Sequence, residues 1–281
     1  MTVLVGAAEL LASDRPVVLL DVRWALGSDR GRERYLAGHL PGAVFVDLDR
    51  ELADPPSAAE GRHPLPSLQR LQEAACRWGI RSGDAVVVYD ASGGMAAARA
   101  WWLLRWAGHS DVRLLDGGLD AWIRAGGPVE QGDVVPELGD VTLAGGGMPV
   151  LTIDDAATLP AAGGFLLDAR AGERYRGEVE PVDPRAGHVP GAVCAPTTEN
   201  LAEDKTFRPP AELVARFDAL GVRPGSTVGV YCGSGVTAAH EVAALAVAGI
   251  DAALWPGSWS QWSADPARPA ATGPDPVSAG A

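Results

Sequence analysis

A cysteine within a loop of small residues is the feature of this sequence that points most directly to chemistry. The loop follows a strand-like segment, 226–230, and precedes a helical run, 237–248. Its residues are Cys232, Gly233, Ser234, Gly235, Val236 and Thr237. Glycines allow the backbone to turn its N–H groups inward on the sulfur, and the helix N-terminus adds partial positive charge. The pattern therefore predicts that Cys232 is an activated nucleophile and not a buried structural cysteine.

The same loop lacks the residues that phosphate chemistry requires. A phosphatase loop of this kind places an arginine six residues after its cysteine to bind phosphate, and that position here is Ala238. No lysine or arginine occurs between Cys232 and Ala248, and the Gly-Lys-Ser/Thr of a nucleotide-binding loop is missing. We therefore expect the loop to hold a thiolate or a small sulfur species.

Length and composition indicate a soluble protein of two domains. The chain has 281 residues, of which 47% are hydrophobic and 21% charged. No apolar run approaches the roughly 20 residues of a membrane span, and the N-terminus does not resemble a signal peptide. Three scattered cysteines favour neither a disulfide framework nor a metal site, and predict a reducing, cytoplasmic compartment. A net charge of −13 argues against nucleic acid as a partner. No organic cofactor is expected.

Four segments of the sequence occur twice in the same order. The pairs are 19–23 with 166–170, 38–44 with 187–193, 86–90 with 228–232, and 115–122 with 254–262. Their offsets of 139 to 149 residues are far longer than the roughly 20–50 residues of a solenoid repeat, so they indicate a duplicated domain. Where the second half has Cys232, the first has Asp90. Only the second half therefore keeps the nucleophile.

Each half alternates short apolar strands with stretches of helical spacing. In the first half, 17–22 and 85–89 are strand-like, and 67–78 and 96–106 are helical. The sequence thus predicts an α/β fold of two tandem domains, each a mainly parallel sheet flanked by helices. We expect a non-catalytic domain at 1–130, a linker at 131–148, a catalytic domain at 149–263 and a flexible tail at 264–281.

Together, the loop, the duplication and two Gly-His-x-Pro-Gly-Ala segments resemble the rhodanese superfamily of sulfurtransferases in its tandem form. The resemblance covers roughly residues 3–263, including the Trp-rich segment 257–262. The loop is most similar to that of the 3-mercaptopyruvate sulfurtransferases. Thiosulfate-specific members carry basic residues just after the cysteine, where this chain has Gly233 and Ser234. The resemblance implies that sulfane sulfur passes from a small-molecule donor through a Cys232 persulfide to an acceptor.

Charge also favours mercaptopyruvate as the donor. It presents one carboxylate, which a single arginine can bind bidentately, whereas the thiosulfate dianion is costly to desolvate beside a neutral loop. By resemblance the donor-binding arginine is Arg174. The family's second arginine falls at Asp183, so the nearest arginine, Arg185, is the candidate for that contact. The loop residues expected to bind the donor are Gly233, Gly235, Val236 and Thr237.

The resemblance further implies a proton relay beside the nucleophile. The loop serine, Ser234, would work with a histidine and an aspartate of the first domain, at the matching positions His63 and Asp49. Two other interpretations remain open: a thiosulfate:cyanide sulfurtransferase, and a persulfide-relay module that docks a dedicated acceptor protein. Thioredoxin, cyanide, a small thiol or a sulfur-carrier protein would all fit as the acceptor. No role is assigned to Cys194.

Overall fold

The computed structural model describes residues 2–276, which divide into two compact units. The first consists of the chain up to Asp54, Leu65–Met148 and Ala202–Phe207, and the second of Pro55–Pro64, Pro149–Leu201 and the chain from Arg208 onward. Each unit thus contains one half of the duplication and a short segment from the other half. The exchange brings His63, which lies in Pro55–Pro64, into the second unit.

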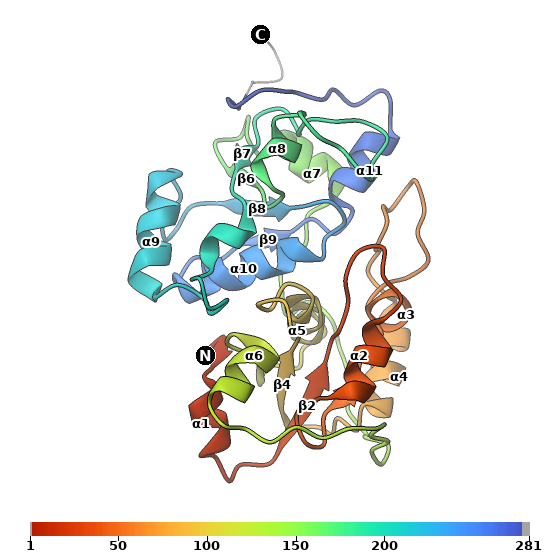
Figure 1. The fold of residues 1–281 in the computed structure, drawn as a ribbon. Coiled ribbons are helices and arrows are strands. Elements are labelled where there is room, and N and C mark those ends of the chain that lie inside the picture. The colour runs from red at the N-terminus through yellow and green to blue at the C-terminus, as the bar shows by residue number, and fades with distance from the viewer. Residues whose placement is uncertain (1, 277–281) are drawn as a thin grey trace. The chain divides into compact units, whose positions relative to one another are not determined.

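The first unit is built on a parallel sheet with the strand order β1-β5-β4-β2-β3 (Figure 1). The strands are β1 (Leu4–Val5), β2 (Val17–Asp21), β3 (Val44–Phe45), β4 (Ala85–Tyr89) and β5 (Val112–Leu115). The helices are α1 (Ala7–Leu11), α2 (Gly31–Ala37), α3 (Leu48–Glu51), α4 (Leu68–Arg77), α5 (Ala97–Trp106) and α6 (Gly118–Arg124). Every residue of the central strand β4 is buried, as expected for a parallel strand covered on both faces.

The second unit repeats this plan on a smaller parallel sheet with the order β7-β6-β8-β9. The strands are β6 (Phe165–Asp168), β7 (Val193–Cys194), β8 (Val228–Tyr231) and β9 (Ala253–Leu254). The helices are α7 (Ile153–Thr158), α8 (Gly172–Tyr175), the 3₁₀ turn η1 (Thr197–Asn200), α9 (Pro210–Ala219), α10 (Thr237–Val247) and α11 (Ser258–Ala264). The predicted α/β class, with parallel sheets flanked by helices, is confirmed.

Two segments differ from the expected domain plan. The predicted linker packs on the first unit, where the N–H groups of Gly139 and Val141 donate to the carbonyls of Cys76 and Ile80 at 2.8 and 3.2 Å. The predicted tail packs on the second unit as far as it is described, because 271 pairs with 188 as a β-bridge. The rest of that tail, 277–281, lies outside the described residues.

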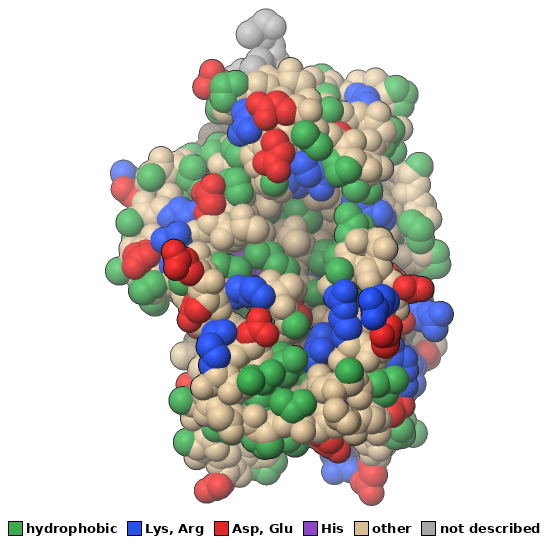
Figure 2. All heavy atoms as spheres, viewed as in Figure 1, with side chains coloured by type: hydrophobic (Ala, Val, Ile, Leu, Met, Phe, Trp, Pro, Cys, Tyr) green, Lys and Arg blue, Asp and Glu red, His purple; other side chains and the backbone are tan. Residues whose placement is uncertain are grey.

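The surface mixes charges of both signs. On the face shown in Figure 2, acidic and basic side chains lie next to one another in several places, between larger uncharged areas, although the chain carries a net charge of −13. Across residues 2–276, no helix combines the length and the apolar character that crossing a membrane requires.

The loop between β4 and α5 binds an anion of its own. The carboxylate of Asp90, which is buried, accepts hydrogen bonds from the backbone N–H groups of Ser92, Gly94, Ala96 and Ala97 at 2.7 to 3.0 Å. This loop occupies the position in the first unit that the β8–α10 loop, with its cysteine, occupies in the second. The repeated loop geometry is therefore suited to holding a negative charge with main-chain donors.

We predict that Asp90→Ala destabilises the protein by about 3 kcal/mol, because buried N–H groups lose their acceptor. Asp90→Asn, which keeps one acceptor oxygen, should cost less. The measurement is the midpoint of denaturant unfolding. Asp218→Ala, which removes an exposed partner of Arg223, serves as the control and should stay within about 0.5 kcal/mol of wild type. An unchanged midpoint for Asp90→Ala would contradict the anion-binding role of the loop.

Candidate active site

Cys232 lies at the carboxyl end of β8, where the strand enters the loop, and its residue is only 2% exposed. Its N–H donates to Ser258 Oγ at 3.1 Å, and its carbonyl accepts from the N–H of Trp259 at 3.0 Å. The carbonyl of Gly233 accepts from the N–H of Ser260 at 2.9 Å. The beginning of α11 thus fixes the nucleophile loop. The Trp-rich segment 257–262 is conspicuous in the sequence, but no pattern in it predicted these contacts of its serines.

Gly235 has a structural reason to be glycine. Its φ is +76°, and a Cβ added there would lie 2.5 Å from the carbonyl oxygen of Pro256. The sharp turn at Gly235 leads directly into α10, which begins at Thr237. Across the described residues, the loop N–H groups with no protein acceptor are those of Gly233, Ser234, Val236 and Thr237. These donors lie in the loop that carries Cys232, as the donors to Asp90 do in the first unit.

Two residues of the predicted relay meet in the second unit. His63 Nδ1 lies 2.7 Å from Ser234 Oγ, and both side chains are buried. His63 reaches the loop because Pro55–Pro64 packs within the second unit; the Gln261 side-chain amide donates to the Ala59 carbonyl at 2.6 Å. Ser234 is two residues after Cys232, and a serine and a histidine at hydrogen-bond distance are able to exchange a proton.

Asp49, the third residue of the predicted relay, belongs to the first unit. It lies on α3, and its two carboxylate oxygens accept from Trp24 Nε1 at 3.0 and 3.1 Å. Its part in the relay stays a prediction.

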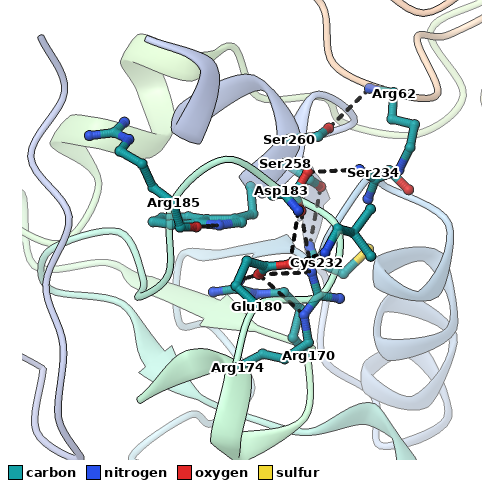
Figure 3. Close-up of polar contacts among 12 residues, drawn as sticks. Arg62, Arg170, Arg174, Glu180, Asp183, Arg185, Cys232, Ser234, Ser258 and Ser260 are labelled. Atoms are coloured by element: carbon teal, nitrogen blue, oxygen red, sulfur yellow. Dashed lines mark hydrogen bonds and ion pairs between the residues drawn. The ribbon is translucent and has the colours of Figure 1, made fainter. Parts of the chain in front are cut away.

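Arg174 lies on α8 and is held by carboxylates (Figure 3). Its Nη2 donates to Glu180 at 2.7 and 2.9 Å and to Asp183 Oδ2 at 3.2 Å. Burial alone would raise the pKa of Glu180, but the N–H groups of Asp183 and Val182 and the Arg174 guanidinium outweigh it, so this pKa lies below its ordinary value. Glu180 is therefore ionised at neutral pH and orients Arg174.

Arg185 has a different role from the one the sequence suggested. Its guanidinium donates to four backbone carbonyls, those of Trp262, Ser263, Asp265 and Arg268, at 2.7 to 2.9 Å. Figure 3 shows it pointing away from Cys232. Arg185 thus ties down the end of α11 and the segment after it, since each of its bonds is to main chain of that region.

A cation that the sequence analysis did not consider lies nearer to the loop. Arg62 Nη1 donates to Asp183 Oδ1 at 2.7 Å, and a Cβ added at Gly233 would lie 3.3 Å from Arg62 Nη2 and 3.5 Å from Arg174 Nη1. The space above Gly233 therefore faces two guanidinium groups. The sequence held one indication that Arg62 lies near the loop: it directly precedes His63.

The other two cysteines show no such setting. Burial, together with the Asp168 carboxylate, raises the pKa of Cys194 to about 11, so it stays a thiol at neutral pH. The Cys76 sulfur lies 3.7 Å from the carbonyl of Val141, to which it donates. The described part of the chain contains no cluster of three or more His, Cys, Asp or Glu residues able to hold a metal ion.

Comparisons with known proteins identify the family of this chain. The rhodanese-like domain family matches residues 6–125 and again 152–265. The chain is 53% identical over 279 residues to a putative thiosulfate sulfurtransferase, SseB, of Mycobacterium tuberculosis, covering 96% of this chain and 97% of the relative. It is 48% identical over 282 residues to a probable 3-mercaptopyruvate sulfurtransferase of Pseudomonas aeruginosa, covering 96% and 98%.

A solved structure extends the similarity to three dimensions. The 3-mercaptopyruvate sulfurtransferase SseA of Escherichia coli matches with a TM-score of 0.81 and 33% identity, over 92% of this chain and all of that one. The resemblance inferred from the nucleophile loop and the duplication is confirmed: the chain belongs to the rhodanese family, with two rhodanese-like domains in tandem.

Proposed function

We propose that this chain moves sulfane sulfur from 3-mercaptopyruvate, through a persulfide on Cys232, to a thiol or cyanide acceptor. The observation that carries the proposal is the contact between Ser234 and His63, 2.7 Å apart in the loop of the buried cysteine. Cleaving mercaptopyruvate releases an enolate, which needs a proton at carbon to become pyruvate. Thiosulfate releases sulfite, a stable anion that needs none. A buried proton-transfer pair beside the nucleophile therefore favours the keto acid.

In the first step, the Cys232 thiolate attacks the donor's sulfur. The new S–S bond forms as the donor's C–S bond breaks, and the bonding electrons leave on the pyruvate enolate. The proton carried by the transferred sulfur reaches the enolate carbon by way of Ser234 and His63, leaving Cys232 as a persulfide anion. The unpaired N–H groups of the loop stabilise charge on sulfur, as an oxyanion hole does on oxygen.

In the second step, an acceptor thiolate attacks the outer sulfur of the persulfide. The S–S bond breaks and Cys232 leaves as a thiolate, so the acceptor carries the persulfide and the enzyme returns to its starting state. The same N–H groups favour this departure, because a stabilised thiolate is a better leaving group. A reducing cytoplasm would keep Cys232 reduced between turnovers and supply thiols such as thioredoxin or a sulfur-carrier protein.

Thiosulfate is the second candidate donor. The Mycobacterium tuberculosis relative is named for it, and two arginine side chains, Arg62 and Arg174, face the space above Gly233. Against it, each of these guanidinium groups is already bound to a carboxylate. A module that relays persulfide sulfur to one dedicated protein would differ from both sulfurtransferases, because it would turn over neither 3-mercaptopyruvate nor thiosulfate rapidly.

Ser234→Ala and His63→Gln should each lower kcat for 3-mercaptopyruvate about 100-fold, the usual contribution of a proton-transfer group. The double variant should be no slower than the worse single one, because the two residues act as a unit. The assay is steady-state transfer to cyanide, with Cys232→Ser as the inactive reference. Ser92→Ala, in the equivalent loop of the first unit, is the matched control and should retain wild-type kcat. If thiosulfate gave the higher kcat/KM in wild type, the donor assignment would be wrong.

We also expect iodoacetamide to label Cys232 several-fold faster than a free thiol near pH 6.5, because the loop N–H groups favour the thiolate. Cys194 should remain unlabelled, since burial holds its pKa at about 11. Peptide mapping after timed labelling measures both rates. Cys194→Ser should leave the pattern unchanged, whereas labelling of Cys232 at the free-thiol rate would rule out activation.

A further inference from the structure

The segment that carries Arg62 is anchored within the second unit to the beginning of α11. The Arg62 N–H donates to Ser260 Oγ at 3.0 Å, and the same hydroxyl donates to the carbonyl of Gly257 at 3.0 Å. Gly61 has a φ of +92°, and a Cβ there would lie 2.5 Å from the Gly257 carbonyl oxygen. This close backbone approach fixes where the Arg62 side chain begins. Arg62 is therefore placed by the fold and not by chance surface packing.

Asp183 joins Arg62 to Arg174. Its Oδ1 accepts from Arg62 Nη1 at 2.7 Å and its Oδ2 accepts from Arg174 Nη2 at 3.2 Å, while the carboxylate itself is only 3% exposed (Figure 3). One buried carboxylate thus orients two guanidinium groups at once. Because each arginine gives only one of its terminal nitrogens to Asp183, the other remains for a ligand.

The remaining nitrogens point to the same place. Within residues 2–276, neither Arg62 Nη2 nor Arg174 Nη1 has a protein acceptor. Both lie within 3.5 Å of the position that a Cβ of Gly233 would take, directly after Cys232 in the chain. Two N–H donors that converge beside the nucleophile match the two oxygens of a carboxylate.

We propose that Arg62 is the second donor-binding residue of this sulfurtransferase, acting with Arg174 on the donor's carboxylate, and that Asp183 is the positioning residue that selects a monoanionic donor. The inference rests on the proposed function and adds the residues that set its donor specificity. Asp183 occupies the position at which the family resemblance implied a second arginine, and Arg62 supplies a positive charge from another segment.

The charges around the site explain the selection. The guanidinium groups of Arg62 and Arg174 pair with the carboxylates of Asp183 and Glu180, and the low pKa of Glu180 keeps it ionised. Glu180 also pairs with the buried Arg170, whose charge is balanced by Asp168. A donor with one negative charge can accept one hydrogen bond from each guanidinium group, although the charges of the site already cancel. Among the described residues, both guanidinium groups are already paired with carboxylates, so the second charge of a dianion would be costly to desolvate.

Arg62→Gln tests the binding role. KM for 3-mercaptopyruvate should rise about 10- to 100-fold, the loss of one charged hydrogen bond, while kcat changes little because the proton-transfer pair is intact. Arg62→Lys keeps a charge for Asp183 but loses the second donor nitrogen, so KM should rise here as well. Arg223→Gln, an exposed arginine of the same unit, is the matched control. An unchanged KM in both Arg62 variants would overturn the proposal.

Asp183→Asn tests the selection. Removing one negative charge should raise kcat/KM for thiosulfate, relative to that for mercaptopyruvate, by about 10-fold. Adding Arg62→Gln to this variant should abolish the increase in relative kcat/KM for thiosulfate, because the positive charge that Asp183 no longer neutralises is that of Arg62. A ratio of the two donors that stays constant or falls in Asp183→Asn would refute the positioning role.

Alkylation separates failure of this inference from failure of the proposed function. Iodoacetate carries a carboxylate and iodoacetamide does not, so the ratio of their rates at Cys232 reports the anion site without any sulfur transfer. Arg62→Gln should lower that ratio about 10-fold, with the iodoacetamide rate held within about two-fold. Were wild type inactive on both sulfur donors, the proposed function would fail while this ratio still decided the role of Arg62. An iodoacetate-to-iodoacetamide ratio in Arg62→Gln equal to that of wild type would reject the role of Arg62 in binding the carboxylate.

Discussion

The whole site depends on one backbone arrangement: a parallel strand that ends in a tight turn and passes at once into a helix. The backbone N–H groups of such a turn can converge on the side chain at the strand end. In the first unit that side chain is Asp90, whose carboxylate takes four of these hydrogen bonds. In the second it is Cys232, and loop donors remain without a protein acceptor. The duplicated loops can therefore be compared within one protein. In the first unit the Asp90 carboxylate occupies the position that a Cys232 thiolate or persulfide would occupy in the second.

Around this loop the protein brings together charges that nearly cancel. Asp183 and Glu180 orient the guanidinium groups and also neutralise them, so the site offers directed hydrogen bonds and little net attraction. Under the proposed function, the direction of the hydrogen bonds would therefore matter more for the choice of donor than the net charge of the site. The nucleophile loop itself has no basic side chain, so the cations nearest to Gly233 come from Arg62 and Arg174, outside the loop.

The strands and helices that depend on local residue patterns could be predicted from the sequence. The strand at 85–89 and the helices near 96–106 and 237–248 follow from apolar spacing and small-residue turns, and the structure has them within one residue. The pair of His63 and Ser234 was predicted only through the family resemblance, since 171 residues separate them. Arg62 and Ser258 were missed because their contacts arise from tertiary packing of Pro55–Pro64 and α11. Arg185 was chosen for its nearness in sequence, yet its direction is set by four main-chain carbonyls.

The most direct test of the account is the intact mass of the protein after incubation with 3-mercaptopyruvate in the absence of any acceptor. The account predicts one added sulfur atom, mapped to Cys232, absent from Cys232→Ser and released by cyanide as thiocyanate. Pyruvate should appear in equal amount, because each transferred sulfur leaves one enolate behind. A protein that gains no sulfur, or gains it on Cys194, would contradict the assignment of Cys232 as the carrier.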